Sequence, residues 1–364
     1  MRIPAEEAQV ARSTKIERVV GAGLLAAAAV AVWRGGAPGR GGSVSAGAAS
    51  DPDAAPSGPL APLDRLQRRT PWLGFVLGVV KRFGEHGAGR LAAVISYYAF
   101  FSIFPLLLAF VTILGFVLEG DEQLRQDLVD SAIGQIPLIG SEIADSAGAL
   151  TGNGVALAVG LGGALWAGMG AMLAGQHAMN TVWDVPRYQR PKLPTARLRA
   201  LGGLAVLGVG VIGSTAVAGL VTAVEGLPVV GRLGLLAANL AVNIGVLALA
   251  FRVLTAERLT WRQVLPGAVV GAVGYVALQN LGTFLVDRFV TGASDTYGTF
   301  AVVIGLLSWF HLLAQVTVFA AEVNVVRARQ MHPRSWAGGA LTDGDQRALA
   351  STRRAAELDA RAVG

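Results

Sequence analysis

Long apolar runs recur along this chain, and most of them reach the roughly 20 residues that a helix needs to cross a bilayer. Helices suit such runs because every backbone polar group inside the hydrocarbon must be satisfied within the protein. Charged residues make up only 15% of the chain, against about 25% in an average soluble domain. The sequence therefore predicts an all-α integral membrane protein, built as a six-helix transmembrane bundle over residues 91–326. The expected spans are Leu91–Leu118, Val155–Val182, Leu201–Val224, Leu233–Leu254, Val264–Val286 and Gly298–Val326.

The loops between these runs differ in charge and so predict the orientation of the bundle. The segment 119–153 holds seven acidic residues and one basic residue, whereas residues 187–199 hold five basic residues and no acidic one. Basic loops stay in the cytoplasm, so we expect the first segment outside and the second inside. Both ends of the core are then cytoplasmic, and the expected location is the inner membrane of a bacterial cell. The net charge of +6 is an orientation signal, and no nucleic-acid partner is expected.

Both ends of the chain differ from the membrane domain. Residues 1–62 combine a marginal apolar segment, Val19–Trp33, with a flexible linker rich in Gly, Pro and Ser. A seventh span, a secretory signal and a wrongly assigned start codon are alternatives for this apolar segment, which is shorter than most spans. Residues 63–90 alternate apolar and basic positions at helical spacing, which predicts an amphipathic juxtamembrane helix. Residues 327–364 are expected to form a basic cytoplasmic tail.

Three polar residues fall on one stripe of the last expected span. His311, Gln315 and Glu322 are offset by four and eleven residues, which places them within roughly 40° of one another around a helix. Ionisable groups inside a membrane are costly and often line a transport pathway or a proton path. The structural alternative is that Glu322 pairs with an arginine from a loop.

Other polar residues inside the expected spans are further candidates for a pathway: Asn324, Asn180, His177, Tyr97 and Ser102. Hydrogen bonds between helices are an alternative role for the asparagines. Pro105 predicts a kink in the first span, where nearby hydroxyls either satisfy the freed carbonyl groups or face a pathway. Glycines four apart, such as Gly267 and Gly271, predict close helix packing.

The chain lacks the usual sequence signatures of catalysis. It contains no Cys, and its four His residues form no metal-binding spacing with each other or with acidic residues. No phosphate-binding or dinucleotide-binding glycine loop stands in a believable context. We therefore expect no metal, no cofactor and no enzymatic activity.

Several segments, taken in order, resemble the YihY/BrkB family of bacterial inner-membrane proteins. They are the run AVISYYAFFSIFPLLL from Ala93, Asn180 with Trp183, Pro266-Gly267-Ala268, Tyr297-Gly298, and Trp309 followed by Glu322 and Asn324. The resemblance implies a six-helix membrane protein of unsettled activity, with virulence or the movement of lipids or small solutes suggested for some members. A ribonuclease name also attaches to the family, but the metal ligands that a nuclease needs are not apparent. Ala321 departs from the Gly usual in the family.

These observations favour a transporter or translocase of an unknown lipid or small solute. A structural scaffold of the cell envelope is the alternative, and a membrane-associated enzyme is the least favoured class. The expected partners are membrane lipids and the unknown substrate, and a homo-oligomer is compatible with the sequence.

Overall fold

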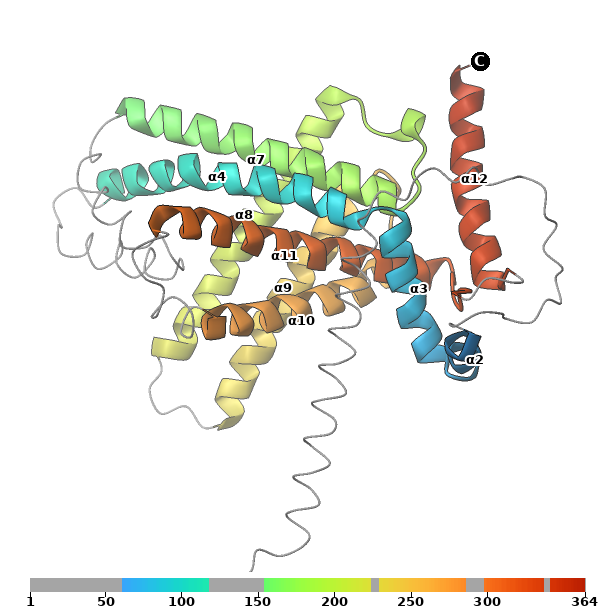
Figure 1. Cartoon of the computed structure of the whole chain (residues 1–364). Helices are drawn as coiled ribbons and strands as arrows, with labels where there is room; N and C mark the ends of the chain where they lie inside the picture. Colours follow the sequence, from blue (N-terminus) through green and yellow to red (C-terminus); the bar gives the residue numbers. More distant parts are fainter. Residues whose placement is uncertain (1–60, 118–153, 224–228, 286–297, 337–340, 364) are drawn as a thin grey trace, which may run out of the picture.

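The computed structural model describes residues 61–117, 154–223, 229–285, 298–336 and 341–363, and the elements within these ranges are helical (Figure 1). The apolar segment Val19–Trp33, nearly all of the linker after it and the whole acidic segment 119–153 lie outside the described residues.

Six long helices occupy the expected apolar runs. They are α4 (Ala88–Val117), α7 (Gly154–Val182), α8 (Leu193–Ala223), α9 (Val229–Leu254), α10 (Trp261–Leu285) and α11 (Gly298–Ala328). Within the described residues, 5 helices are long and apolar enough to cross a membrane, and α10 is not among them. The all-α membrane fold is thus confirmed, while the count of six spans stays a prediction.

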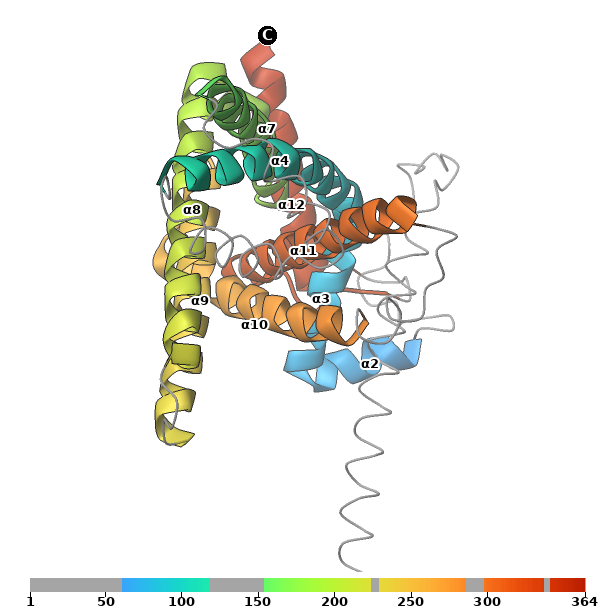
Figure 2. The same ribbon diagram turned by 90° about the vertical axis from the view of Figure 1, so that its left-hand side faces the viewer.

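The long helices pack mainly as pairs (Figures 1 and 2). Helix α4 lies against α7, α8 against α9, and α10 against α11. Helix α11 also contacts α4, α3 and α7, which makes it the central element of the bundle. Close approach depends on glycine, because a Cβ added at Gly267 would overlap the Ala320 carbonyl oxygen and the Asn324 amide of α11.

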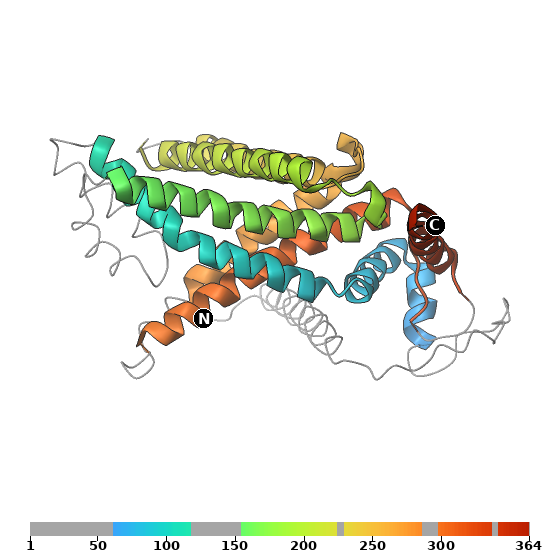
Figure 3. The same ribbon diagram turned by 90° about the horizontal axis from the view of Figure 1, so that it is seen from above.

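Three further helices gather at one end of the bundle, which we call the capped end (Figures 1 and 3). This is the end at which α4 begins and α7, α9 and α11 finish. The segment 63–90 contains α2 (Ala61–Arg69) and α3 (Pro71–Glu85), which a proline at the start of α3 separates. The tail contains α12 (Asp343–Val363). The apolar core concentrates at this same end, around Trp183, Phe251 and Met179.

Candidate functional site: a buried ion cluster at the capped end

Local backbone structure brings four charged side chains to the centre of the capped end. Arg82 stands in the last turn of α3 and His86 follows directly after that helix, so the two residues lie four apart on one face. Glu322 projects from the last third of α11. Asp184 follows α7 in a left-handed conformation with φ of 48°, which aspartate tolerates better than most residues.

These side chains contact one another over short distances. Asp184 Oδ2 lies 2.5 Å from Arg82 Nη2, and Glu322 Oε1 lies 2.5 Å from His86 Nδ1. His86 Nε2 also lies 3.5 Å from Asp184 Oδ1, so the imidazole bridges the two carboxylates. Arg82 Nε faces Glu322 Oε2 at the same distance of 3.5 Å, and neither of these two atoms has a hydrogen-bond partner.

These four side chains are largely buried, and two cations face two carboxylates. The side chains of Arg82 and Glu322 are 1% and 0% exposed. Burial opposes protonation of His86, but hydrogen bonds to Asp184 and Glu322 outweigh it and raise the pKa of His86 to about 9. Burial also opposes the charge of Asp184, yet the His86 hydrogen bond and the Arg82 charge hold the pKa of this carboxyl well below its usual range. His86 is therefore a cation at neutral pH.

Arg329 extends the cluster toward the protein surface. Its guanidinium donates to Asp184 Oδ2 at 3.2 Å, to the Trp183 carbonyl oxygen at 2.8 Å and to Ser351 of α12. Ser351 in turn donates to Asp184 Oδ2 at 2.6 Å. We call Arg82, His86, Asp184, Glu322 and Arg329 the buried ion cluster. It joins α3, the end of α7, α11 and, through Ser351, α12.

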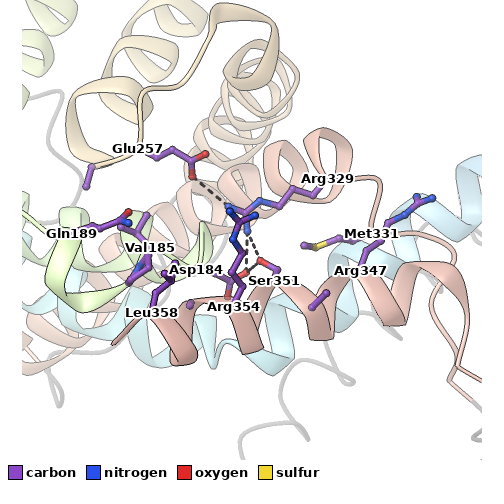
Figure 4. A pocket seen from close by; sticks show the side chains of 14 residues that line it. Asp184, Val185, Gln189, Glu257, Arg329, Met331, Arg347, Ser351, Arg354 and Leu358 are labelled. Carbon is purple, nitrogen blue, oxygen red and sulfur yellow. Dashed lines mark hydrogen bonds and ion pairs between the residues drawn. The ribbon is translucent and has the colours of Figure 1, made fainter. Parts of the chain in front are cut away.

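A cavity of about 670 Å³ opens beside Arg329 (Figure 4). Figure 4 shows Arg329 between Glu257, which precedes α10, and Ser351 of α12, with Glu257 Oε2 3.3 Å from Arg329 Nη2. Arg347 and Arg354 of α12 also line this cavity, together with Val185, Met331 and other apolar groups. Asp184 lies at the cavity wall, so the cluster has an aqueous side.

A second polar network fastens α2, α3 and α12 together. Asp345 at the start of α12 accepts hydrogen bonds from Arg334 at 2.7 Å and from Lys81 of α3 at 3.0 Å. Burial disfavours the charged carboxylate, but hydrogen bonds from Thr342, Ser335 and these cations hold the pKa of Asp345 well below its usual range. Gln67 of α2 donates to the Arg334 carbonyl oxygen at 2.5 Å. The helices outside the bundle are thus tied to it by polar contacts.

The stripe expected on the last span divides between two environments. Gln315 and His311 share a hydrogen bond of 2.9 Å. Glu322 lies two turns farther along α11, about 10 Å from Gln315 along the axis, and contacts Arg82 and His86. The arginine that pairs with Glu322 comes from α3 and not from a loop between spans. A pathway role for this stripe stays a prediction.

The other candidate residues make local or interhelical contacts. The Asn324 side-chain oxygen accepts from the Gly267 backbone N–H of α10 at 2.6 Å, and the Asn180 side-chain oxygen accepts from the Ala256 N–H at 2.7 Å. His177 lies 3.3 Å from Arg190, measured between Nδ1 and Nη1. Ser102 donates to the Ala99 carbonyl oxygen at 2.7 Å.

Two candidates of the first span lie on different sides of it. Tyr97 is 55% exposed, and its ring meets the Tyr98 ring edge-on and the Phe101 ring at a tilt. Pro105, inside α4, lies against α7, because a Cβ added at Gly163 would come within 2.9 Å of the proline Cβ.

Sequence reasoning missed most of the cluster. Arg82 belonged to a helix expected to lie on the membrane surface, yet it is one of the largest fully buried side chains. The spacing of Arg82 and His86, and an acidic residue at 184 ahead of five basic ones, are signals that could have pointed to them. Ser351 offered no comparable signal. Within the described ranges, no group of three His or acidic side chains is arranged to hold a metal ion.

Comparisons with known proteins agree with this architecture. The sequence profile of a family described as virulence factor BrkB matches residues 79–340. This range includes every residue of the buried ion cluster but neither Ser351 nor the rest of α12.

Curated relatives are similar over most of the chain. A putative ribonuclease-like protein of Bacillus subtilis, YfkH, is 25% identical over 279 residues, which cover 70% of this chain and 95% of the relative. The inner membrane protein YhjD of Escherichia coli is 24% identical over 71% of this chain and 82% of its own length. A membrane protein of Nitrosospira multiformis, called UPF0761, is 23% identical over 72% of this chain and 62% of its own length. No solved structure gives a significant match.

Proposed function

This chain belongs to the virulence factor BrkB family, and from that premise we propose that it moves a lipid or a small solute across a bacterial membrane. The buried ion cluster serves as the gate at the capped end. Both ends of the core lie in the cytoplasm in this proposal, which makes the capped end the cytoplasmic side.

The observation that carries the proposal is the burial of Glu322 with its charged partners. Glu322 is fully buried in a membrane-spanning helix, and its charged partners are Arg82 of α3, a helix outside the bundle, and His86 directly after α3. Taking charges out of water costs several kcal/mol per ion, and a well-packed apolar plug of similar volume is often at least as stable. The use of charged residues at this position, where apolar ones would be at least as stable, therefore favours a gate that closes in one specific arrangement and can open again.

Opening has a simple physical route. The cluster joins separate elements, so loss of a few ion pairs would let α3 and the ends of α7 and α11 part and would expose their charges to water. Hydration would then offset the lost contacts, which gives two arrangements of similar free energy. Such bistable interfaces underlie conformational switching. Gln315 and His311 lie deeper in α11 and would line the pathway behind the gate.

The test follows solvent access to Gln315 from both sides of the membrane. The chain contains no Cys, so Gln315→Cys supplies a unique thiol. We expect a membrane-impermeant thiol reagent to label it from the side opposite the capped end. When His86→Gln and Glu322→Gln are added, labelling should appear from the capped end.

Leu312→Cys is the matched control, because Leu312 lies on the same helix with 37% exposure and is expected to face lipid. It should resist the reagent from both sides in either background. If Gln315→Cys shows the same labelling with and without the cluster substitutions, the gate and the transport function are wrong, and a scaffold role becomes the better account.

A further inference from the structure

A groove of about 300 Å³ runs between α4 and α7 near the capped end, separate from the buried ion cluster. The two helices lie side by side along this stretch (Figures 1 and 3). Each contributes one stripe at helical spacing. Arg90, Val94 and Tyr98 come from α4, and Gly170, Leu173 and His177 come from α7. Because the helices are antiparallel, Arg90 and His177 meet at the capped end of the groove, and Tyr98 and Gly170 meet at its deeper end.

The deeper end of the groove is apolar and faces outward. Val94 is 50% exposed and Tyr98 is 37% exposed, on helices that are long and apolar enough to span a membrane. Such side chains face the hydrocarbon of the bilayer. The Tyr98 ring lies directly over Gly170, where a Cβ would overlap it, so the absence of a side chain at position 170 lets the ring form part of the groove.

The other end of the groove is cationic. Arg90 lies in the first turn of α4 and makes no ion pair with any residue that the structure describes. Its guanidinium rests against Gly87 at the entrance to the helix. Arg190, held by the Val185 carbonyl oxygen at 3.1 Å, has its Nη1 3.3 Å from Nδ1 of His177, which lines the groove. A second guanidinium group thus lies next to a residue of this end of the groove.

We propose that this groove binds a membrane phospholipid with an anionic headgroup. The lipid phosphate contacts Arg90 at the end of the groove where Arg190 approaches His177, and the upper part of an acyl chain lies over Val94 and Leu173 toward Tyr98. Arg90 and Tyr98 are eight residues apart, about 12 Å along the helix, so the cations stand at headgroup level while the ring stands in the hydrocarbon. Basic pockets between spanning helices are suited to anionic headgroups, because the phosphate gains charge pairing while the chains stay in an apolar medium.

This site does not depend on the transport function, because a lipid can occupy the groove of a protein that transports nothing. The experiment uses the full-length protein in detergent and three probes: dioleoylphosphatidylglycerol, dioleoylphosphatidylcholine and inorganic phosphate. Binding is measured by native mass spectrometry. We expect phosphatidylglycerol to bind more tightly than phosphatidylcholine. Arg90→Gln should weaken phosphatidylglycerol binding about five-fold, the effect of one cation near an anionic lipid.

Two matched controls come from the same chain. Arg197, an exposed arginine near the start of α8, does not line the groove, so Arg197→Gln should leave the affinity unchanged. Phe104→Ala, at an exposed aromatic residue of the same helix, should likewise have no effect, whereas Tyr98→Ala should weaken binding of both lipids, because Tyr98 lines the groove and Phe104 does not. Should Arg90→Gln fail to fold, Arg190→Gln removes the other cation and supplies the same comparison.

Equal binding of the two lipids to the wild type would overturn the proposal, as would equal losses from Arg90→Gln and Arg197→Gln. If inorganic phosphate displaces phosphatidylglycerol at similar concentration, the groove is a site for a soluble anion and the lipid assignment is wrong.

Discussion

At the capped end, a single charged residue can hold several partners together, and Asp184 is the main example. Asp184 contacts Arg82, His86, Arg329 and Ser351. No other described carboxylate at this end has hydrogen-bond or ion-pair partners from as many elements. Its position after α7 is fixed by a turn in which the Val185 N–H donates to the Asn180 carbonyl oxygen at 2.8 Å. A buried carboxylate with this many donors keeps its charge. When one donor is removed, the charged form loses much of its stabilisation.

The stability of the protein should depend on pH through His86. The raised pKa of His86, from 6.5 to about 9, means that the folded state binds the proton more tightly than the unfolded state does. The resulting stability is fully present below pH 6.5 and is lost as pH rises through about 9. Asp184 acts in the opposite sense, because its lowered pKa makes its contribution disappear only in strong acid.

We therefore expect the difference in melting temperature between wild type and His86→Gln to shrink from pH 6 to pH 10 in detergent, and to hold between pH 5 and pH 6. His332→Gln serves as the control, because neither Asp184 nor Glu322 contacts that ring, and burial with the nearby Arg347 charge lowers its pKa. A difference for His86→Gln that stays constant up to pH 10 would contradict the assignment of a cation at this position.

A second prediction separates two neighbouring hydroxyl groups. Ser351 donates to Asp184 and accepts from Arg329, whereas Thr352 donates only to the Ala348 carbonyl oxygen of its own helix at 3.2 Å. Ser351→Ala should cost about 1–2 kcal/mol, the range for a hydrogen bond to a charged group that is not fully buried. Thr352→Ala should be nearly neutral. Thermal unfolding of both variants measures this, and equal effects would show that α12 does not support the cluster.

At the scale of the helices, backbone contact between α10 and α11 organises the bundle centre. Gly267 approaches the Ala320 carbonyl oxygen, and Asn324 of α11 accepts a hydrogen bond from the Gly267 N–H at 2.6 Å. This bond satisfies a backbone donor next to Pro266, where the helix ladder is weakened. Gly267 thus allows both the close packing of α10 on α11 and the hydrogen bond to Asn324.

Gly267→Ala should therefore destabilise the protein by about 1–3 kcal/mol, the usual cost of overpacking, because the added methyl group would push α10 from α11. Gly245→Ala in α9 is the control, since a Cβ at that position meets no atom within 4 Å. Thermal unfolding in detergent measures both. An unchanged melting temperature for Gly267→Ala would mean that the two helices can separate at little cost.

At the scale of the whole molecule, the capped end holds both the apolar core cluster and the buried ion pairs of the described fold. The apolar core, the buried ion cluster and the outer helices α2, α3 and α12 meet there (Figure 1). Arg327 lies in the last turn of α11, and further basic residues follow α7 and α11 at this end, among them Arg187, Arg190 and Arg329. From the positive-inside rule we expect this end to face the cytoplasm.

Reporter fusions test that orientation. A fusion after residue 192 follows α7 and should give a cytoplasmic signal, whereas a fusion after residue 135, in the acidic segment, should give a periplasmic one. The cause is the excess of basic residues in one segment and of acidic residues in the other. The reverse pair of signals would mean that the capped end, and the gate with it, faces the outside of the cell.

The sequence by itself determined the all-α membrane fold, the approximate positions of the long helices and the family. Apolar run length is a local property, and a bilayer converts it directly into helices. Glu322 could be identified from the sequence in the same way, because a charged residue inside a long apolar run is evident without knowing which residues it contacts.

Only the tertiary structure decided what Glu322 contacts. Its partners Arg82 and His86 lie 240 and 236 positions away along the chain, in a segment whose periodicity is typical of a surface helix. Helix periodicity shows which residues share a face but not which element covers that face, and for α3 the cover is α11. Ser351 joins the cluster for the same reason, since docking of α12 and not local sequence brings its hydroxyl to Asp184.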